Sequence, residues 1–397
     1  MKLKWIALKL LAAAMATYRR GAPQAEFDRA KLSSARIALV KTDGIGDFIL
    51  STTFLQVVRE QLPWAEITLF CRRPVGEIAR QQFPGWTVVE LPPVRSTLQN
   101  LLLDGATRHQ LKSQKKFDVL LDLRTFRDFT DSTISSWIPA SIKLAQENTL
   151  RMARPEFCLP READVYDVLL PLPDYKKNPD IHDLQNYRLL AEYFFPGRTG
   201  DLQLQPRLNV AGEEKADLVQ RFGPELEKPF VLVCPGARFS IREYPVEKLA
   251  DAIAGAVKNF PLQVVVAGGR AELALTAQLA ETLSRSGIKV FNLAGKLNLA
   301  EHTVLISSAK AVVCMETSHA HFAGALGRPG IVIIGGGHFG LFAPWGESPV
   351  FRWLTNRVPC FGCHWNCIHD RPLCITDIPP AVIAQNLNEV LGRLSDG

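Results

Sequence analysis

The sequence predicts an α/β protein built from two consecutive Rossmann-like domains, each with a parallel sheet, that face each other across a cleft. Short apolar runs of strand length alternate with helical segments from residue 36, and a second such series begins near Glu213. This alternation is typical of βαβ units, whose buried strands are continuous apolar runs. A chain of 397 residues is also too long for one hydrophobic core. Two such domains suit a donor bound by one half and an acceptor bound by the other.

The first strand, loop and helix carry the most informative residues of the N-terminal half. Residues 37–40 form an apolar strand, and Gly44 and Gly46 permit a sharp turn after it. Asp47 then falls on the first turn of a helix, at the carboxyl end of the strand, where open α/β sheets bind ligands. The helix N-terminus favours a negative charge on Asp47, although this residue could serve only as a cap. The loop lacks the third glycine of a dinucleotide fingerprint and the lysine of a P-loop.

The other segments of the first domain follow from the same signals. Strands are expected at residues 66–72, 87–91 and 117–123, and helices at residues 98–114 and 182–195. Residues 139–180 carry many prolines, so we expect irregular loops there. Residues 196–206 are expected to form a linker.

The second domain repeats the pattern. Strands are expected at residues 230–234, 262–267, 289–293, 311–315 and 331–334, the last of which closes the series. Helices are expected at residues 246–260, 271–286, 299–308, 316–326 and 380–394. We expect that the final helix could cross back to the first domain.

These signals set the expected domain boundaries. The expected parts are a basic amphipathic segment (1–34), an acceptor-binding domain (35–205), a donor-binding domain (206–378) that includes a cysteine-rich loop (358–376), and a C-terminal helix (379–397).

The N-terminal segment mixes lysines with tryptophan and leucines. Its apolar run is too short to span a bilayer, and Lys9 interrupts what would be the core of a signal peptide. A basic helix of this kind can lie in a membrane interface, and it can equally pack on its own protein or on a partner chain. We therefore expect a cytoplasmic protein, and attachment to the inner face of the cytoplasmic membrane stays open.

The overall composition is that of an ordinary globular protein, with 47% hydrophobic and 22% charged residues. The formal net charge of +6 is modest for this length. It suits an anionic ligand or a membrane surface, but it is not strong enough to argue for a nucleic acid, and we expect none as a partner.

The eight cysteines fall into two groups. Cys71, Cys158, Cys234 and Cys314 are scattered, mostly in apolar runs, and are expected to be buried free thiols. The second group consists of Cys360, Cys363, Cys367 and Cys374. Four thiols in one short loop can meet around a structural zinc or iron ion. Their spacing matches neither common ferredoxin run, and disulfides or unlinked thiols are the alternatives.

Three strand-end loops of the second domain are candidates for donor binding. Thr317, Ser318 and His319 follow Glu316 at a helix N-terminus, where backbone N–H groups suit a diphosphate. Arg238 and Arg242 could neutralise a leaving diphosphate. Glycines that would let a nucleotide approach the backbone are Gly236, Gly268 and Gly269. Taken singly, each loop could equally hold ordinary caps, surface charges and turns.

As an ordered set these motifs resemble glycosyltransferase family 9, the bacterial heptosyltransferase family with the GT-B fold. The matching residues are Gly44-Ile45-Gly46-Asp47 with Leu50, Pro235-Gly236-Ala237 with Arg242 and Tyr244-Pro245, and Glu316-Thr317-Ser318 with His321, Ala325-Leu326 and Pro329. The resemblance implies that Asp47 is the general base, within an acceptor-side loop that includes Asp43, Gly44 and Gly46. It implies that Arg242 stabilises the leaving diphosphate.

The resemblance further implies that Glu316, Thr317, Ser318 and His321 line the nucleotide-sugar pocket. The usual donor of the family is ADP-heptose and the usual acceptor a lipopolysaccharide core, with inversion at the anomeric carbon and no catalytic metal or other cofactor.

The sequence departs from the family pattern in three places. Glu316-Thr317-Ser318 stands where aspartate-threonine-glycine is frequent, and Tyr244 stands where better-known members carry tryptophan. The tail after Gly337, which includes the four-cysteine loop, resembles a less-studied branch. Three alternatives therefore stay open: transfer of heptose to a protein acceptor, a sugar-nucleotide epimerase of the same fold, and a noncatalytic module that binds a membrane surface or a metal.

Overall fold

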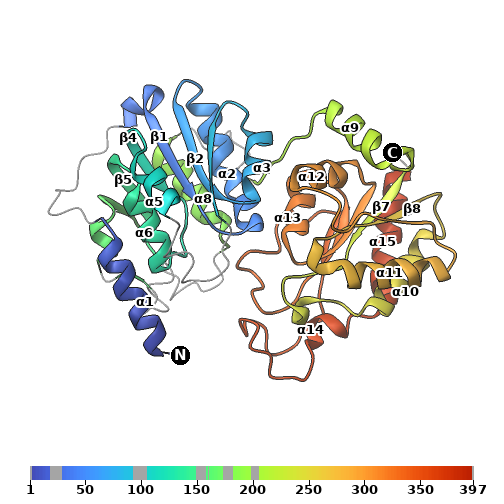
Figure 1. Ribbon diagram of the computed structural model, residues 1–397. Coiled ribbons are helices and arrows are strands. Elements are labelled where there is room, and N and C mark those ends of the chain that lie inside the picture. Colours follow the sequence, from blue (N-terminus) through green and yellow to red (C-terminus); the bar gives the residue numbers. More distant parts are fainter. Residues whose placement is uncertain are drawn as a thin grey trace. The chain divides into compact units, whose positions relative to one another are not determined.

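Figure 1 shows the computed structural model, which describes residues 2–17, 29–92, 105–148, 158–159, 161–172, 182–197 and 205–395. The chain forms two compact units. Unit 1 comprises residues 1–181 and 185–204, and unit 2 comprises residues 182–184 and 205–397. Residues 98–104 of a predicted helix and most of the predicted linker lie outside the described residues.

A parallel six-stranded sheet forms the centre of unit 1, in the order β3-β2-β1-β4-β5-β6. Its strands are β1 (Arg36–Lys41), β2 (Glu66–Arg72), β3 (Thr87–Leu91), β4 (Phe117–Asp122), β5 (Ala140–Gln146) and β6 (Val168–Leu170). Its helices include α2 (Ile45–Gln61), α3 (Val75–Gln82), α5 (Gly105–Lys112), α6 (Phe129–Trp137) and α8 (Leu184–Phe194). Since β1 pairs with both β2 and β4, the apolar run at residues 37–40 is buried at the centre of the sheet.

The prediction of irregular loops at residues 139–180 is wrong, because β5 and β6 lie there. The sequence does not predict β5, because polar residues interrupt its apolar positions. Lys143 on β5 is buried, and its ammonium donates to the backbone oxygens of Ser135 and Ser136, at 2.7 and 2.9 Å. These oxygens lie in the last turn of α6, where the helix dipole favours a cation. A contact between two elements therefore makes a buried lysine acceptable in a central strand.

Unit 2 contains a second parallel six-stranded sheet, in the order β12-β11-β10-β7-β8-β9. Its strands are β7 (Phe230–Cys234), β8 (Gln263–Val266), β9 (Val290–Asn292), β10 (Ala311–Met315), β11 (Gly330–Ile333) and β12 (Phe351–Leu354). Numbered from the first strand of each unit, the two sheets have the same order, which confirms the predicted pair of Rossmann-like sheets. The strand at residues 331–334 does not close the series as expected, since β12 pairs with β11.

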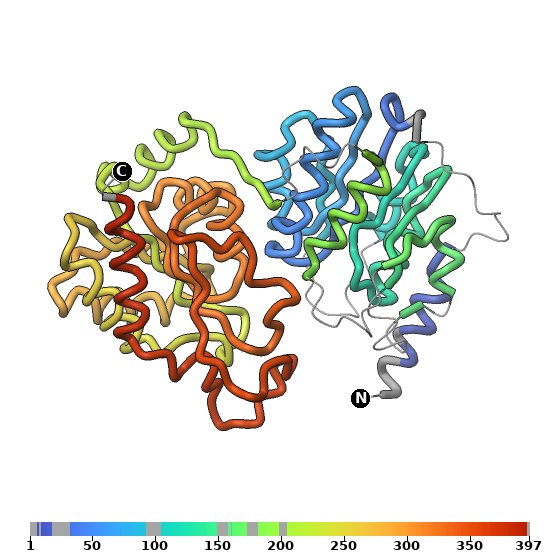
Figure 2. Tube along the Cα trace, turned by 180° about the vertical axis from the view of Figure 1, so that it is seen from behind, coloured from blue at the N-terminus to red at the C-terminus, as the bar shows by residue number. Residues whose placement is uncertain are grey.

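The helices of unit 2 are α9 (Gly212–Phe222), α10 (Val246–Val257), α11 (Leu273–Arg285), α12 (Leu299–Ser308), α13 (Ser318–Ala325), α14 (Leu373–Thr376) and α15 (Pro380–Ser395). The last helix does not cross back to unit 1. Helix α15 packs along α10 (Figure 2) and buries Ile383, Leu387 and Val390 in the core cluster of unit 2. Its apolar stripe therefore completes one face of the second sheet.

The N-terminal helix α1 (Lys2–Met15) packs on α6 through its C-terminal end. Ala12 is fully buried, and the indole N–H of Trp137 donates to the backbone oxygen of Met15, at 2.8 Å. By contrast, Ile6 and Leu10 expose 55% and 63% of their surface. No helix among the described residues is long and apolar enough to cross a membrane.

Candidate active site

The strand order reverses at one point in each sheet, and the predicted site residues follow the strands on either side of that point. The reversal lies between β1 and β4 in unit 1 and between β7 and β10 in unit 2. Neighbouring connections leave in opposite directions at such a point, so the carboxyl ends of the two strands open a crevice that binds ligands in α/β proteins. Asp43 to Asp47 follow β1, Gly236 to Arg242 follow β7, and Glu316 to His321 follow β10.

Asp47 lies on the first turn of α2, as predicted. Its Oδ2 accepts a hydrogen bond from the backbone N–H of Gly44, at 3.1 Å. A Cβ at Gly44 would lie 2.9 Å from that same oxygen, so glycine permits the close approach. The capping role is therefore present in the structure, and it holds a half-buried carboxylate at the carboxyl end of β1.

Asp43, in the same loop, is held by two buried cations. Its Oδ2 accepts from the ammonium of Lys41, at 2.7 Å, and lies 3.9 Å from Nε of Arg124. Lys41 also donates to the hydroxyl of Tyr187 on α8, at 2.6 Å. Burial alone would lower the pKa of Arg124, but the carboxylates of Asp131 and Asp43 raise it above its usual value. Sequence reasoning missed Lys41 as a site residue, although a lysine that ends an apolar strand is a signal.

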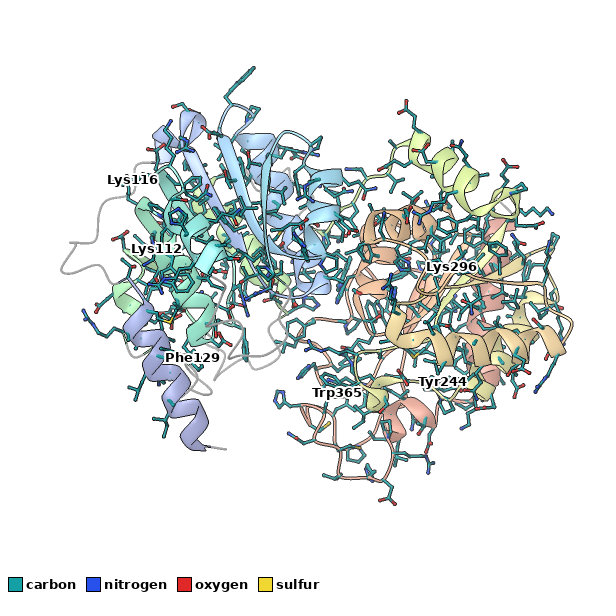
Figure 3. The ribbon with its side chains drawn as sticks, viewed as in Figure 1. Lys112, Lys116, Phe129, Tyr244, Lys296 and Trp365 are labelled. Atoms are coloured by element: carbon teal, nitrogen blue, oxygen red, sulfur yellow. The ribbon has the colours of Figure 1, made fainter. Side chains whose placement is uncertain are left out.

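In unit 2, buried Glu316 forms an ion pair with Arg242, whose side chain is 19% exposed. The Nη2 of Arg242 donates to the backbone oxygen of Glu316, at 2.6 Å, and lies 3.1 Å from the carboxylate oxygen Oε1. The guanidinium also lies 4.9 Å from the ring centroid of Trp365. Trp365, labelled in Figure 3, belongs to the four-cysteine loop. Among the described residues, neither Nε of Arg242 nor Oε2 of Glu316 has a hydrogen-bond partner. Both atoms are buried, and buried polar atoms without a partner are uncommon in folded proteins, so this pair is a candidate for contact with a ligand.

The pKa of Glu316 is raised to about 7, because burial disfavours its charged form more strongly than Arg242 favours it. Glu316 is 5% exposed. A carboxyl group with this pKa can donate or accept a hydrogen bond near neutral pH. Glu316 is therefore better suited to hydrogen-bond a hydroxyl group of a ligand than to act only as a fixed negative charge.

Helix α13 begins directly after Glu316. Thr317 is its N-cap and accepts from the backbone N–H of His319, at 3.3 Å. His321 is buried, and its Nδ1 accepts from the indole N–H of Trp345, at 2.9 Å. Burial lowers the pKa of His321 to about 3, so the ring is neutral and Nε2 carries its proton. Ser318 is the first residue of the helix and is half-buried, and a helix N-terminus suits an anion.

The glycines after β7 and β8 surround a carboxylate that sequence reasoning missed. The carboxylate of Glu272 accepts from the backbone N–H of Gly269, at 2.5 Å. A Cβ at Gly236 or Gly268 would lie 2.2 or 2.5 Å from its oxygens, so both glycines make room for Glu272. Burial raises the pKa of Glu272. Arg238, which we expected to contact the donor, is exposed in the structure.

The four-cysteine loop adjoins Arg242. Cys360, Cys363, Cys367 and Cys374 line one cavity together with Trp365. Gly335 and Gly337 are closely approached by the Trp365 ring, since a Cβ at these positions would lie 2.6 and 2.3 Å from it. Trp365 itself has a φ of 61°, a left-handed conformation that is uncommon for a bulky residue. The loop thereby places the indole ring of Trp365 in contact with the guanidinium of Arg242.

The departure at Tyr244 has a structural explanation. The ring of Tyr244 is buried in the core of unit 2, and its hydroxyl donates to the backbone oxygen of Ile378, at 2.6 Å (Figure 3). This bond fixes the residues just before α15. The four scattered cysteines are buried free thiols, as predicted.

The raised pKa of Glu316 should make protein stability depend on pH. An unfolded glutamate loses its proton near the usual value of 4.5, whereas folded Glu316 keeps it up to about 7. The free energy of unfolding should therefore fall as the pH rises through this interval, and level off above it. Glu316→Gln, which mimics the neutral form, should flatten that fall when thermal unfolding is followed from about pH 5 to about 8.

Glu281→Gln is the matched control, because Glu281 lies on α11 with 64% of its side chain exposed. It should keep the slope of the wild type. Identical pH profiles for Glu316→Gln and the wild type would contradict a raised pKa at this residue.

The comparisons with known proteins agree with this architecture. The model of glycosyltransferase family 9 (heptosyltransferase) matches residues 108–368. Lipooligosaccharide heptosyltransferase 2 of Haemophilus influenzae is 25% identical over 329 residues, which cover 75% of this chain and 83% of that protein. Lipopolysaccharide heptosyltransferase 2 of Salmonella typhimurium is 31% identical over 134 residues, which cover 33% of this chain and 38% of that protein.

Solved structures show the same fold. ADP-heptose lipopolysaccharide heptosyltransferase II of Escherichia coli superposes with a TM-score of 0.65 at 18% identity, over 91% of this chain and 99% of that one. A family 9 glycosyltransferase of Veillonella parvula superposes with a TM-score of 0.67 at 15% identity, over 93% of this chain and 99% of that one. The two parallel sheets are therefore those of a GT-B fold. The chain belongs to glycosyltransferase family 9, the heptosyltransferase family.

Proposed function

We propose that this protein is an inverting heptosyltransferase that transfers heptose from ADP-heptose to a hydroxyl group of a lipopolysaccharide core. Family membership supports the reaction class. The observation on this chain that carries the proposal is the ion pair of half-buried Arg242 and buried Glu316 at the switch point of unit 2. This pair offers a guanidinium and a carboxyl group beside a helix N-terminus, a combination that suits a nucleotide sugar better than either group alone.

In this proposal the donor binds to unit 2. The diphosphate lies at the N-terminus of α13, near Ser318 and the neutral His321, and Arg242 stabilises the negative charge that grows on the leaving group. Oε2 of Glu316 hydrogen-bonds a hydroxyl group of the donor. The bond-breaking step needs no metal or other cofactor, because Arg242 and the helix amides neutralise the leaving diphosphate.

Asp47 acts as the general base on the acceptor. Its carboxylate takes the proton of the acceptor hydroxyl as the oxygen attacks the anomeric carbon. The bond between that carbon and the diphosphate breaks on the opposite face, and ADP leaves with the bonding electrons. Attack from the opposite face inverts the configuration. The hydrogen bond from Gly44 orients the carboxylate, and the cations around Asp43 give the loop a fixed shape.

Asp47→Asn tests the base without removing the cap. The amide oxygen of asparagine can still accept from Gly44, but the side chain is no longer basic. The value of kcat should fall by ~10²-fold or more, as is typical for loss of a general base. Binding of ADP should stay close to that of the wild type. The measurement is transfer of labelled heptose from ADP-heptose to heptose-deficient lipopolysaccharide core.

Glu214→Gln is the matched control, because Glu214 makes the same contact to a backbone N–H at the start of α9, at 2.8 Å. It should leave kcat unchanged. Wild-type turnover in Asp47→Asn would refute the general-base assignment. Epimerised or hydrolysed donor without transfer, in the wild type, would refute the transferase proposal itself.

We also propose that the four-cysteine loop binds a structural zinc or iron ion. All four thiols line one cavity. The sulfur atoms must draw together around an ion, because no three of them lie within 4.8 Å of one another. A bound ion would hold Trp365 against Arg242 and so link the loop to the donor site.

Metal analysis of protein purified without chelator tests this site. Cys360→Ser should lower the number of tightly bound ions by about one per chain, since it removes one of the four thiolates. Cys71→Ala, which removes a buried thiol from unit 1, should leave that number unchanged. An unaltered metal content in Cys360→Ser would exclude the loop as a metal site.

The proposed acceptor is a glycolipid, and α1 is the proposed contact with the membrane that carries it. Ile6 and Leu10 are exposed apolar residues, which suit contact with lipid acyl chains. The lysines at positions 2, 4 and 9 suit attraction to anionic head groups. Because the end of α1 packs on α6, the exposed part is presented by a helix that is itself held by unit 1.

The double variant Ile6→Glu/Leu10→Glu should bind anionic vesicles more weakly than the wild type, while its thermal unfolding stays unchanged. Sedimentation with vesicles at low and high salt measures both the apolar and the electrostatic contribution. Leu273→Glu, at an exposed leucine of α11, is the control. Equal vesicle binding by all three proteins would reject the membrane contact.

A further inference from the structure

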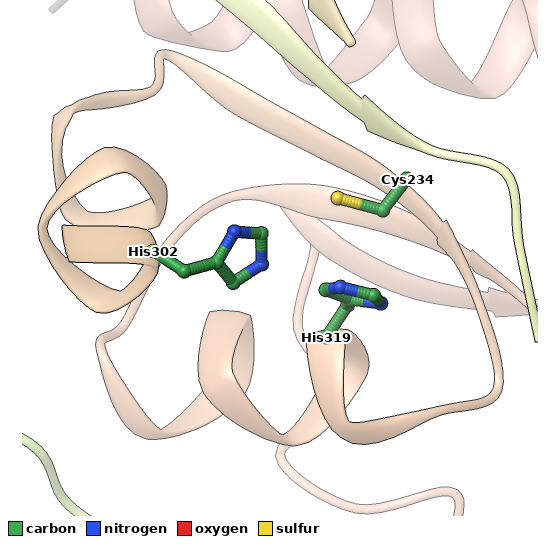
Figure 4. A group of neighbouring side chains, drawn as sticks. All are labelled: Cys234, His302 and His319. Carbon is green, nitrogen blue, oxygen red and sulfur yellow. The ribbon is translucent and has the colours of Figure 1, made fainter. Parts of the chain in front are cut away.

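A second group of potential metal ligands lies in unit 2, outside the four-cysteine loop. It consists of Cys234, His302 and His319, whose ligand atoms all lie within 4.8 Å of one another (Figure 4). Cys234 is the last residue of β7, His302 lies in α12, and His319 lies in the first turn of α13. The three side chains therefore come from three separate elements that meet at the switch point of the sheet.

The strand alternation explains why they meet. Val231 and Val233 of β7 belong to the core cluster shared with α10, α11 and α15. Side chains alternate along a strand, so Cys234 points to the opposite face. Helices α12 and α13 supply the two imidazoles to that face, and the rings of His302 and His319 lie with centroids 4.9 Å apart.

Both imidazoles can offer a nitrogen lone pair. Nε2 of His302 is buried without a hydrogen-bond partner among the described residues, and the residue is only 7% exposed. Nδ1 of His319 lies 2.9 Å from the hydroxyl oxygen of Thr317. That hydroxyl is positioned to donate to the backbone oxygen of Met315, at 3.4 Å, so its oxygen is left to accept the Nδ1 proton of His319. Nε2 of His319 then keeps its lone pair, as in histidines that bind metal ions.

We propose that Cys234, His302 and His319 bind a zinc ion or a similar thiophilic divalent cation. Zinc takes both thiolate and imidazole ligands, and a site with three protein ligands leaves the fourth tetrahedral position to a water molecule. Binding releases the thiol proton of Cys234 to solvent. The ligand atoms need to close to roughly 3.5 Å from one another, a small rotation of side chains from their present spacing.

The ion would tie β7, α12 and α13 together on one side of the candidate donor site. It would hold His319, and through it Thr317, at the N-terminus of α13. The consequence for donor binding rests on the proposed function, whereas metal binding itself does not. The alternative is a neutral histidine pair packed against an inert thiol in the core.

The experiment measures the metal content of the full chain. The background variant carries Cys360→Ser and Cys363→Ser, so that ions bound by the four-cysteine loop do not contribute. This protein, purified without chelator and loaded with zinc, should hold about one tightly bound ion per chain. Cys234→Ala and His302→Gln in that background should each lose it, while Cys71→Ala should retain it.

Circular dichroism and thermal unfolding establish that each variant is folded. If either Cys234→Ala or His302→Gln fails to fold, X-ray absorption of the zinc-loaded background protein decides the question instead. A shell of mixed nitrogen and sulfur with a single sulfur supports the site. The proposal is overturned if the background protein binds no zinc, if both folded variants keep their ion, or if the shell contains no sulfur. In each of these cases transfer activity can still be measured, so the proposed function would be judged separately.

Discussion

The pairing of Arg242 with Glu316 is the interaction on which the second unit's site depends. Burying the carboxylate of Glu316 without a partner would be costly, and Arg242 offsets part of the desolvation that raises the pKa of this group. Here the pair joins the end of β10 to the short helical turn at residues 240–242, and Trp365 covers the guanidinium. The backbone oxygen of Glu316 takes part as well, so the path of the chain between β10 and α13 depends on this contact.

Unit 1 also places charged groups next to one another at its switch point. Lys41 and Arg124 are buried beside Asp43, and Tyr187 and Asp131 provide the remaining polar partners. In both units a charged group follows a central strand and meets an opposite charge, which comes from Lys41, only two residues away, in unit 1 and from a distant segment in unit 2. The carboxyl ends of the strands can therefore present polar groups in fixed positions without a large loss of stability, which suits electrostatic preorganisation.

The same unit 2 loops carry two further features that need not take part in the reaction. The four-cysteine loop contacts Arg242 through Trp365, and the group of Cys234, His302 and His319 adjoins Thr317. The four-cysteine loop comes after both Arg242 and Glu316 in the chain, whereas Cys234, His302 and His319 come before, between and after them. A structural ion at either place would restrict the motion of a donor loop, because metal ligation fixes side chains from separate elements at once.

The sequence by itself determined the local elements and the reaction class. The apolar runs of β1, β7 and β10 predicted their bounds closely, because strands buried on both faces are nearly continuous apolar runs. The bounds of β2 and β3 were also predicted closely, although polar residues interrupt both strands. The glycines after β1 placed Asp47 on the first helical turn, and the ordered motifs indicated the family that the comparisons then showed.

Only the tertiary structure decided where polar residues could be buried and which distant elements meet. It revealed β5, whose Lys143 is acceptable only because the last turn of α6 receives its ammonium. It placed α15 on α10, and it brought Glu272 between two glycines, Trp365 onto Arg242, and Cys234 beside two histidines. Local patterns carry no information on such contacts, because each joins side chains from different elements of the fold.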